Sequence, residues 1–140
     1  MSKDRNESGH STKPRRDTYM PGLIAMGALY VAAGVNHFVM SRLYLSIVPP
    51  YIPHPQAMVW LSGAAEIACG IAVLVPDGTV FRNSRRAACL GLIALLIAVF
   101  PANLHMALHP QLFPSIPTWA LWARLPLQLP LIAWAWWHAR

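Results

Sequence analysis

A single carboxylate, Glu66, lies near the centre of a long apolar run that ends at Pro76. An ionised side chain in the middle of a bilayer costs about 2.5 kcal/mol or more unless it is paired, protonated or hydrated. Glu66 therefore needs a partner or has a functional role. The best candidate partner is Arg124, which interrupts another apolar run near the carboxyl end. We predict that these two residues form an ion pair within the membrane.

Other polar side chains interrupt the apolar runs at Asn36, His37 and Asn103. At 1.5 Å per helical residue, Glu66 would lie about 13 Å and Arg124 about 8 Å below the same surface. The polar groups thus converge on one half of a hydrocarbon core about 30 Å thick. Such a cluster is typical of a ligand or proton site. The alternative is that the ion pair and the amides only fix the packing of the helices.

Two further histidines, His105 and His109, have the i, i+4 spacing that places two imidazoles on one helix face, as metal sites often require. His37 could supply a third imidazole near the same surface. However, the spacing fixes no third ligand, and His109 stands directly before Pro110. We therefore predict no metal site and keep His105 and His109 as weak candidates.

The elements that must position these residues are predicted to be helices that span a membrane. The chain is 56% hydrophobic and 11% charged, whereas about a quarter of the residues of a soluble domain are charged. Residues 1–17 are polar and predict a disordered cytoplasmic tail, with adhesion to anionic lipid as the alternative. We predict an all-α fold, a single four-helix transmembrane bundle over residues 18–140, with spans at about 20–40, 57–76, 87–108 and 119–137.

The connections between these spans predict their orientation. Residues 41–56 contain four prolines and an amphipathic pattern that includes Tyr44 and Tyr51, which predicts an outer loop in the interface or over the bundle. The tail, residues 77–86 and the carboxyl end carry nine Lys and Arg residues, against one in the two remaining connections. The positive-inside rule then places both termini in the cytoplasm.

The net charge of +6 is compatible with nucleic-acid binding. We predict no nucleic-acid partner, because the basic residues lie mostly at span ends, where cytoplasmic retention explains them. No heme signature, nucleotide-binding loop or nucleophile triad is visible, so nothing indicates a self-contained enzyme, and a catalytic role stays open. The predicted surroundings are the lipid bilayer, with a membrane redox partner or a homo-oligomer as the candidate assembly.

Several motifs resemble the DoxX-like family of small four-helix bacterial membrane proteins. They cover most of residues 20–110 in the order of that family, whereas the tail lies outside the match and the fourth predicted span matches poorly. Ser41-Arg42 stands where the family usually has a proline. The matching motifs are Ala33-Gly34-Val35-Asn36-His37-Phe38, Tyr44 with Ile47-Val48-Pro49-Pro50-Tyr51-Ile52-Pro53, Ser62-Gly63-Ala64-Ala65-Glu66-Ile67 with Gly70, and Phe100-Pro101-Ala102-Asn103 with Met106.

The resemblance implies a multi-pass protein of the bacterial cytoplasmic (inner) membrane with a link to redox chemistry. The family takes its name from a subunit associated with a thiosulfate:quinone oxidoreductase, and related bundles act as chaperones or bind sterols. We therefore expect a redox-associated subunit that binds a quinone-like or other amphipathic small molecule in an outer-leaflet polar pocket. The alternatives are a non-catalytic assembly or chaperone-like protein and a solute or proton transporter. The candidate ligand-binding residues are Glu66, Arg124, His37, Asn36, Asn103, Tyr44 and Tyr51.

Overall fold

The computed structural model describes residues 20–76, 79 and 82–140. The predicted disordered tail, residues 1–17, lies outside the described residues. Within the described ranges the secondary structure is helical throughout, which confirms the all-α prediction. The elements are α1 (Met20–Val39), α2 (Ser41–Ile47), α3 (Pro55–Leu74), α4 (Ser84–Leu108), the 3-10 turn η2 (Pro110–Leu112) and α5 (Thr118–Ala139).

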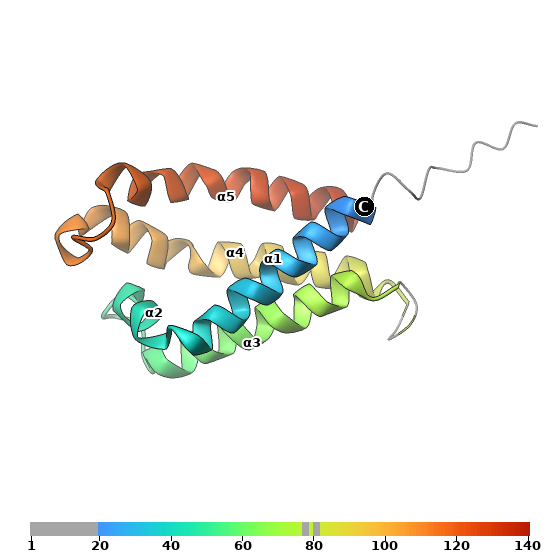
Figure 1. Cartoon of the computed structure of the whole chain (residues 1–140), viewed down its shortest axis with the longest axis horizontal. Helices are drawn as coiled ribbons and strands as arrows, with labels where there is room; N and C mark the ends of the chain where they lie inside the picture. The colour runs from blue at the N-terminus through green and yellow to red at the C-terminus, as the bar shows by residue number, and fades with distance from the viewer. Residues whose placement is uncertain (1–19, 77–78, 80–81) are drawn as a thin grey trace, which may run out of the picture.

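The four long helices run along the length of the molecule, and the short α2 lies at one end (Figure 1). The most extensive packing is between α1 and α3, followed by α4 against α5 and α3 against α4. The chain turns at η2 at the same end as α2. We call this the α2 end of the bundle.

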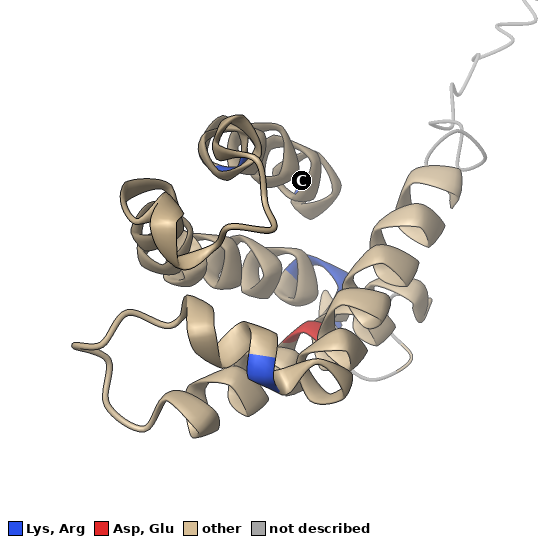
Figure 2. Cartoon of the chain, turned by 60° about the vertical axis from the view of Figure 1, so that its left-hand side comes forward, with Lys and Arg blue, Asp and Glu red and all other residues tan. Residues whose placement is uncertain are grey.

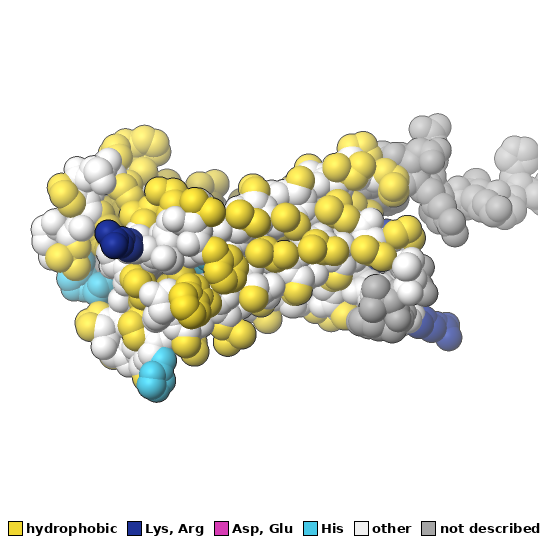
Figure 3. Space-filling model, turned by 60° about the horizontal axis from the view of Figure 1, so that its bottom comes forward, with side chains coloured by type: hydrophobic (Ala, Val, Ile, Leu, Met, Phe, Trp, Pro, Cys, Tyr) yellow, Lys and Arg dark blue, Asp and Glu magenta, His cyan; other side chains and the backbone are white. Residues whose placement is uncertain are grey.

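Three of the helices, α1, α3 and α4, are long and apolar enough to cross a membrane. Hydrophobic side chains cover most of the length of the face in Figure 3, and Lys and Arg side chains lie near its ends. Such a surface suits contact with lipid rather than with water. The helix α5, which carries Arg124, is not among the three.

Glycines bring α1 and α3 into backbone contact. A Cβ atom added at Gly34 would lie 2.6 Å from the carbonyl oxygen of Gly63, and one added at Gly70 would lie 3.0 Å from that of Gly27. Only glycine permits so close an approach of two antiparallel helices. This contact also places His37 against α3, because a Cβ at Gly63 would lie 2.6 Å from the His37 Cβ.

The proline-rich segment 41–56 contains a helix that its prolines do not predict. The prolines begin only at Pro49, so nothing in Ser41–Ile47 prevents α2 from forming. Pro55 then occupies the first turn of α3, where its missing N–H has no intrahelical partner to lose. The segment is therefore half helix and half turn.

The apolar core is divided along the bundle. A smaller cluster of Met106, Phe113 and Leu121 lies toward the α2 end, with Ile47 packed against it. In the other half, α5 is tied to α4 by the buried Gln128, whose Nε2 donates to the Leu96 carbonyl oxygen at 2.8 Å. The larger cluster there comprises Leu23, Met26, Tyr30, Val73, Ala88, Cys89, Leu92, Leu96, Ala135 and Ala139.

Candidate functional site

A cavity of about 440 Å³ lies between the two apolar clusters. This volume is within the range of small-molecule sites, about 300–1,000 Å³. All five α-helices contribute to its wall, which is mainly aliphatic. The polar side chains in the wall are His37, Tyr44, Ser62, Glu66, Asn103 and Arg124.

The cavity brings together most of the residues that the sequence singles out. Two of the candidates lie elsewhere. Asn36 is not in the wall, but its Nδ2 donates to the Tyr44 hydroxyl at 3.3 Å. Tyr51 is 72% exposed and does not line the cavity. The candidates that do line it are Glu66, Arg124, His37, Asn103 and Tyr44.

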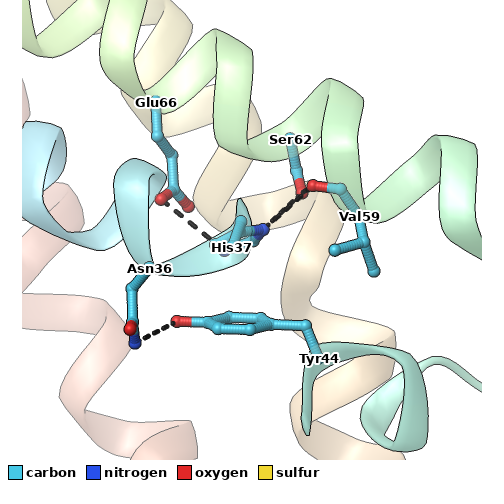
Figure 4. Close-up of polar contacts among 6 residues, drawn as sticks. All are labelled: Asn36, His37, Tyr44, Val59, Ser62 and Glu66. Carbon is cyan, nitrogen blue, oxygen red and sulfur yellow. Dashed lines mark hydrogen bonds and ion pairs between the residues drawn. The ribbon is translucent and has the colours of Figure 1, made fainter. Parts of the chain in front are cut away.

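The predicted ion pair between Glu66 and Arg124 is not formed. Instead, the Glu66 Oε2 lies 3.7 Å from the His37 Nε2 (Figure 4). The reason is helix packing, because α3 packs most closely on α1, whereas α5 packs on α4. Arg124 directs its Nη1 to the Met106 Sδ at 3.6 Å. Glu66 and Arg124 thus belong to two walls of one cavity.

The ring of His37 is fixed by neighbours on several sides. Its Nδ1 lies 3.1 Å from the Val59 carbonyl oxygen and 3.0 Å from the Ser62 Oγ. The Tyr44 ring lies against it, tilted by 33°, with 3.9 Å between the centroids. In Figure 4, His37 stands between Glu66 on one side and Ser62 and Val59 on the other. The imidazole is therefore held in one orientation with Nε2 toward the carboxyl group.

These contacts also decide which nitrogen carries the proton. The Ser62 hydroxyl donates to the Val59 carbonyl oxygen at 3.0 Å, which uses its only proton. A lone pair on the His37 Nδ1 would then face two acceptor oxygens. A proton on Nδ1 instead donates to both of them. In the neutral ring the Nε2 then carries the lone pair, and it faces the Glu66 Oε2 at 3.7 Å.

The carboxyl group of Glu66 has an oxygen atom without a hydrogen-bond partner among the described residues. Its Oε2 is buried and has no hydrogen-bond partner among the described residues, since 3.7 Å to His37 is beyond hydrogen-bond range. An unsatisfied buried polar atom costs about 1–3 kcal/mol. A ligand or a water molecule in the cavity would remove this cost. The pair can therefore donate or accept a hydrogen bond at the cavity wall.

The two weak metal candidates lie away from this pair. The rings of His105 and His109 stack with 4.4 Å between their centroids, and the His109 Nδ1 is 2.9 Å from the His105 carbonyl oxygen. Neither residue lines the cavity. Within residues 20–76, 79 and 82–140, no group of three His, Cys, Asp or Glu residues is placed to hold a metal ion.

Sequence reasoning assigned no individual role to Ser62 or Met106. Ser62 stands four residues before Glu66, so both side chains lie on one face of α3. That spacing indicates that Ser62 can contact the same residue as Glu66, which is His37. The contact of Met106 with Arg124 has no such signal, because it depends on which helices are neighbours.

Comparison with known proteins places the chain in one family. A family model described as a domain of unknown function (DUF8561) matches residues 26–139. The match includes every residue that lines the cavity. No curated protein and no solved structure matches the chain. The chain belongs to the DUF8561 family.

Proposed function

We propose that this DUF8561 protein binds a quinone-like or other amphipathic small molecule in the cavity at the α2 end. The observation that carries this proposal is the buried, unsatisfied Glu66 Oε2 at the wall of a mainly aliphatic cavity. A quinone headgroup offers carbonyl oxygens that accept hydrogen bonds, and its tail needs an apolar slot. A carboxyl group beside an imidazole in an apolar wall offers such a headgroup a hydrogen-bond donor and a proton acceptor.

Access from the lipid supports a ligand of this class. Leu61 and Met58 line the cavity, yet they are 63% and 42% exposed on the surface of the bundle. The cavity wall is therefore also part of the lipid-facing surface. An amphipathic molecule dissolved in the bilayer can reach the cavity sideways, with its head toward His37 and its tail toward α4.

For the topology we propose four spans with both termini in the cytoplasm, α5 being the fourth. The 22 residues of α5 extend about 33 Å, which is enough to cross the hydrocarbon core. Gln128 is buried and bonds to α4, whereas Arg124 is exposed at the surface and also lines the cavity. The unequal distribution of Lys and Arg supports the orientation. The cavity would then lie in the outer leaflet.

The resemblance to DoxX-like proteins supports a redox-associated subunit of the bacterial inner membrane. The motifs that carry this resemblance are far apart in the sequence, but each contributes to the cavity wall. They supply His37, Tyr44, Ser62, Glu66 and Asn103. Shared motifs that converge on one cavity are expected where a ligand is shared. The proposed assembly is with a membrane redox partner or with further copies of the chain.

The test is mass spectrometry of small molecules retained by the purified protein, with a variant that fills the cavity. Ala98 lines the cavity on α4, and Ala94 lies one turn away, exposed and outside the wall. We expect wild type and Ala94→Trp to retain a quinone or another amphipathic molecule and Ala98→Trp to lose it. Equal retention by both variants, or none by wild type, would contradict the proposal.

An assembly or chaperone-like role is the second candidate. Small residues on a helix face allow another helix to dock there. However, the small residues Gly27, Gly34, Gly63 and Gly70 already join α1 to α3. A partner protein would need another surface, for which the exposed Trp119 and Trp122 on α5 are available. A stoichiometric partner recovered in mild detergent and lost on Arg124→Ala would favour this role. Flux into liposomes would favour the third reading, a solute or proton transporter.

A further inference from the structure

The positive charge of Arg124 faces the cavity without an acidic side chain in contact with it. Glu66 is the only acidic side chain in residues 20–76, 79 and 82–140 (red in Figure 2). It lies on another wall of the cavity, 3.7 Å from the His37 Nε2, and forms no ion pair with Arg124.

The guanidinium of Arg124, which is an exposed residue, has few partners among the described residues. Its one hydrogen bond to the described residues is from Nη1 to the Met106 Sδ at 3.6 Å. A thioether is a weak acceptor, and a guanidinium has five N–H donors. Since Glu66 lies beside His37, no carboxylate in the described part of the chain pairs with Arg124. Most of its donors are left for another molecule.

Asn103 is a second polar residue of the same cavity. It lines the cavity on α4, one turn before Met106, which Arg124 contacts. Its side chain makes no hydrogen bond to the described residues. A carboxamide without a hydrogen bond to the described residues and a guanidinium with only a thioether contact thus line the cavity from α4 and α5.

We propose that Arg124 and Asn103 form a subsite for one negative charge, and that the cavity takes an anionic amphiphile. The head would be a carboxylate or a phosphate, which the planar guanidinium binds through two parallel N–H donors. The Asn103 amide donates a further hydrogen bond, and the aliphatic wall holds the tail. This inference rests on the proposed function and names the ligand class of the same cavity. A neutral head leaves the charge of Arg124 uncompensated.

The experiment compares a charged probe, tritiated palmitate, with its neutral methyl ester, which has the same hydrocarbon tail. Saturable binding is measured to the full-length protein in nanodiscs of neutral phosphatidylcholine. Arg124→Gln removes the charge, and Arg42→Gln is the matched control, because Arg42 is exposed on α2 and does not line the cavity. We expect wild type and Arg42→Gln to bind palmitate about tenfold more tightly than the ester. Arg124→Gln should lose this preference.

Arg124→Lys is a second variant, which separates loss of charge from loss of folding in Arg124→Gln. It keeps the positive charge and should therefore keep a preference for the acid over the ester. Phosphatidylglycerol added to the nanodiscs distinguishes the two sources of the anion. Displacement of palmitate by this lipid identifies a lipid phosphate, and displacement only by free fatty acid identifies a carboxylate. Both results support the subsite.

The inference is overturned if palmitate and its ester bind wild type equally while decylubiquinone, a neutral quinone, binds saturably. In that case the proposed function stands and the charge subsite does not exist. If palmitate, its ester and decylubiquinone all fail to bind saturably, the proposed function fails as well. The two failures are therefore separable.

Discussion

The α1–α3 wall of the cavity is held by backbone contact at glycines, whereas the α4–α5 wall is held by larger side chains and one buried amide. The polar groups of the two walls also differ in how many contacts hold them. On the first wall His37 and Glu66 lie beside each other and His37 is hydrogen-bonded. On the second, Arg124 has only a thioether contact. Close packing fixes a polar pair in place, and looser packing leaves a charge available to a ligand.

The largest expected effect comes from breaking the glycine contact. Gly34→Val would force a side chain to within 2.6 Å of the Gly63 carbonyl oxygen, so we expect a loss of more than about 3 kcal/mol in the free energy of unfolding. The measurement is thermal denaturation in detergent. Ala32→Val is the control, because Ala32 is exposed on the same helix. A Gly34→Val protein as stable as wild type would show that the backbones are not in contact.

The corresponding change on the other wall should cost less. Gln128→Leu keeps the volume but removes the 2.8 Å hydrogen bond to the Leu96 carbonyl oxygen, for which we expect a loss of about 1–2 kcal/mol. The same denaturation experiment measures it. If Gln128→Leu destabilises the protein more than Gly34→Val, the α4–α5 wall is the more tightly held one and the comparison is reversed.

Ser62→Ala tests the α1–α3 wall, because it removes one hydrogen-bond partner of His37 and leaves Glu66 unchanged. The hydroxyl accepts from the His37 Nδ1 and is partly buried, so its removal should weaken binding of decylubiquinone by about fivefold. Stability should change little. Ser46→Ala is the control, because the Ser46 hydroxyl bonds only to the Leu43 carbonyl oxygen on the exposed side of α2. Unchanged affinity in Ser62→Ala would mean that this hydroxyl does not orient the imidazole.

Tyr44→Phe should have the smallest effect. It removes the 3.3 Å hydrogen bond from Asn36 but keeps the ring that stacks on His37. We expect about 0.5–1 kcal/mol lower stability and less than a threefold change in affinity for decylubiquinone. Tyr44→Ala, which also removes the stacked ring, should weaken binding more. Equal effects of the two variants would assign the role to the hydroxyl rather than to the ring.

The positions of the long helices could be predicted because apolar runs of spanning length are a strong signal. The first predicted span, about 20–40, agrees with α1 at Met20–Val39. The short α2 was missed because four prolines in 41–56 suggested that the whole segment is irregular, although they begin only at Pro49. A proline restricts its own surroundings and not the residues two turns earlier.

The partner of Glu66 was missed for a different reason. Spacing along the sequence gives the depth of a residue on its helix, but not which helices are neighbours. Gly27 and Gly34 are seven residues apart, as are Gly63 and Gly70. This matched spacing is the signal that would have paired α1 with α3 and pointed to His37 rather than to Arg124. Arg124 and Asn103 could be named as candidate ligand-binding residues from the sequence, but the separation of Arg124 from Glu66 could not, because it depends on which helices are neighbours.

The most direct test of the account is the affinity of decylubiquinone for Glu66→Gln in neutral nanodiscs. Glutamine keeps the shape of the side chain but can neither release nor take up the proton of a carboxyl group. We expect affinity about tenfold or more below that of wild type, with thermal stability retained, because the cavity wall loses the carboxyl group that meets the headgroup. Wild-type affinity in a folded Glu66→Gln protein would contradict it and leave the carboxyl group as a packing feature of α1 and α3.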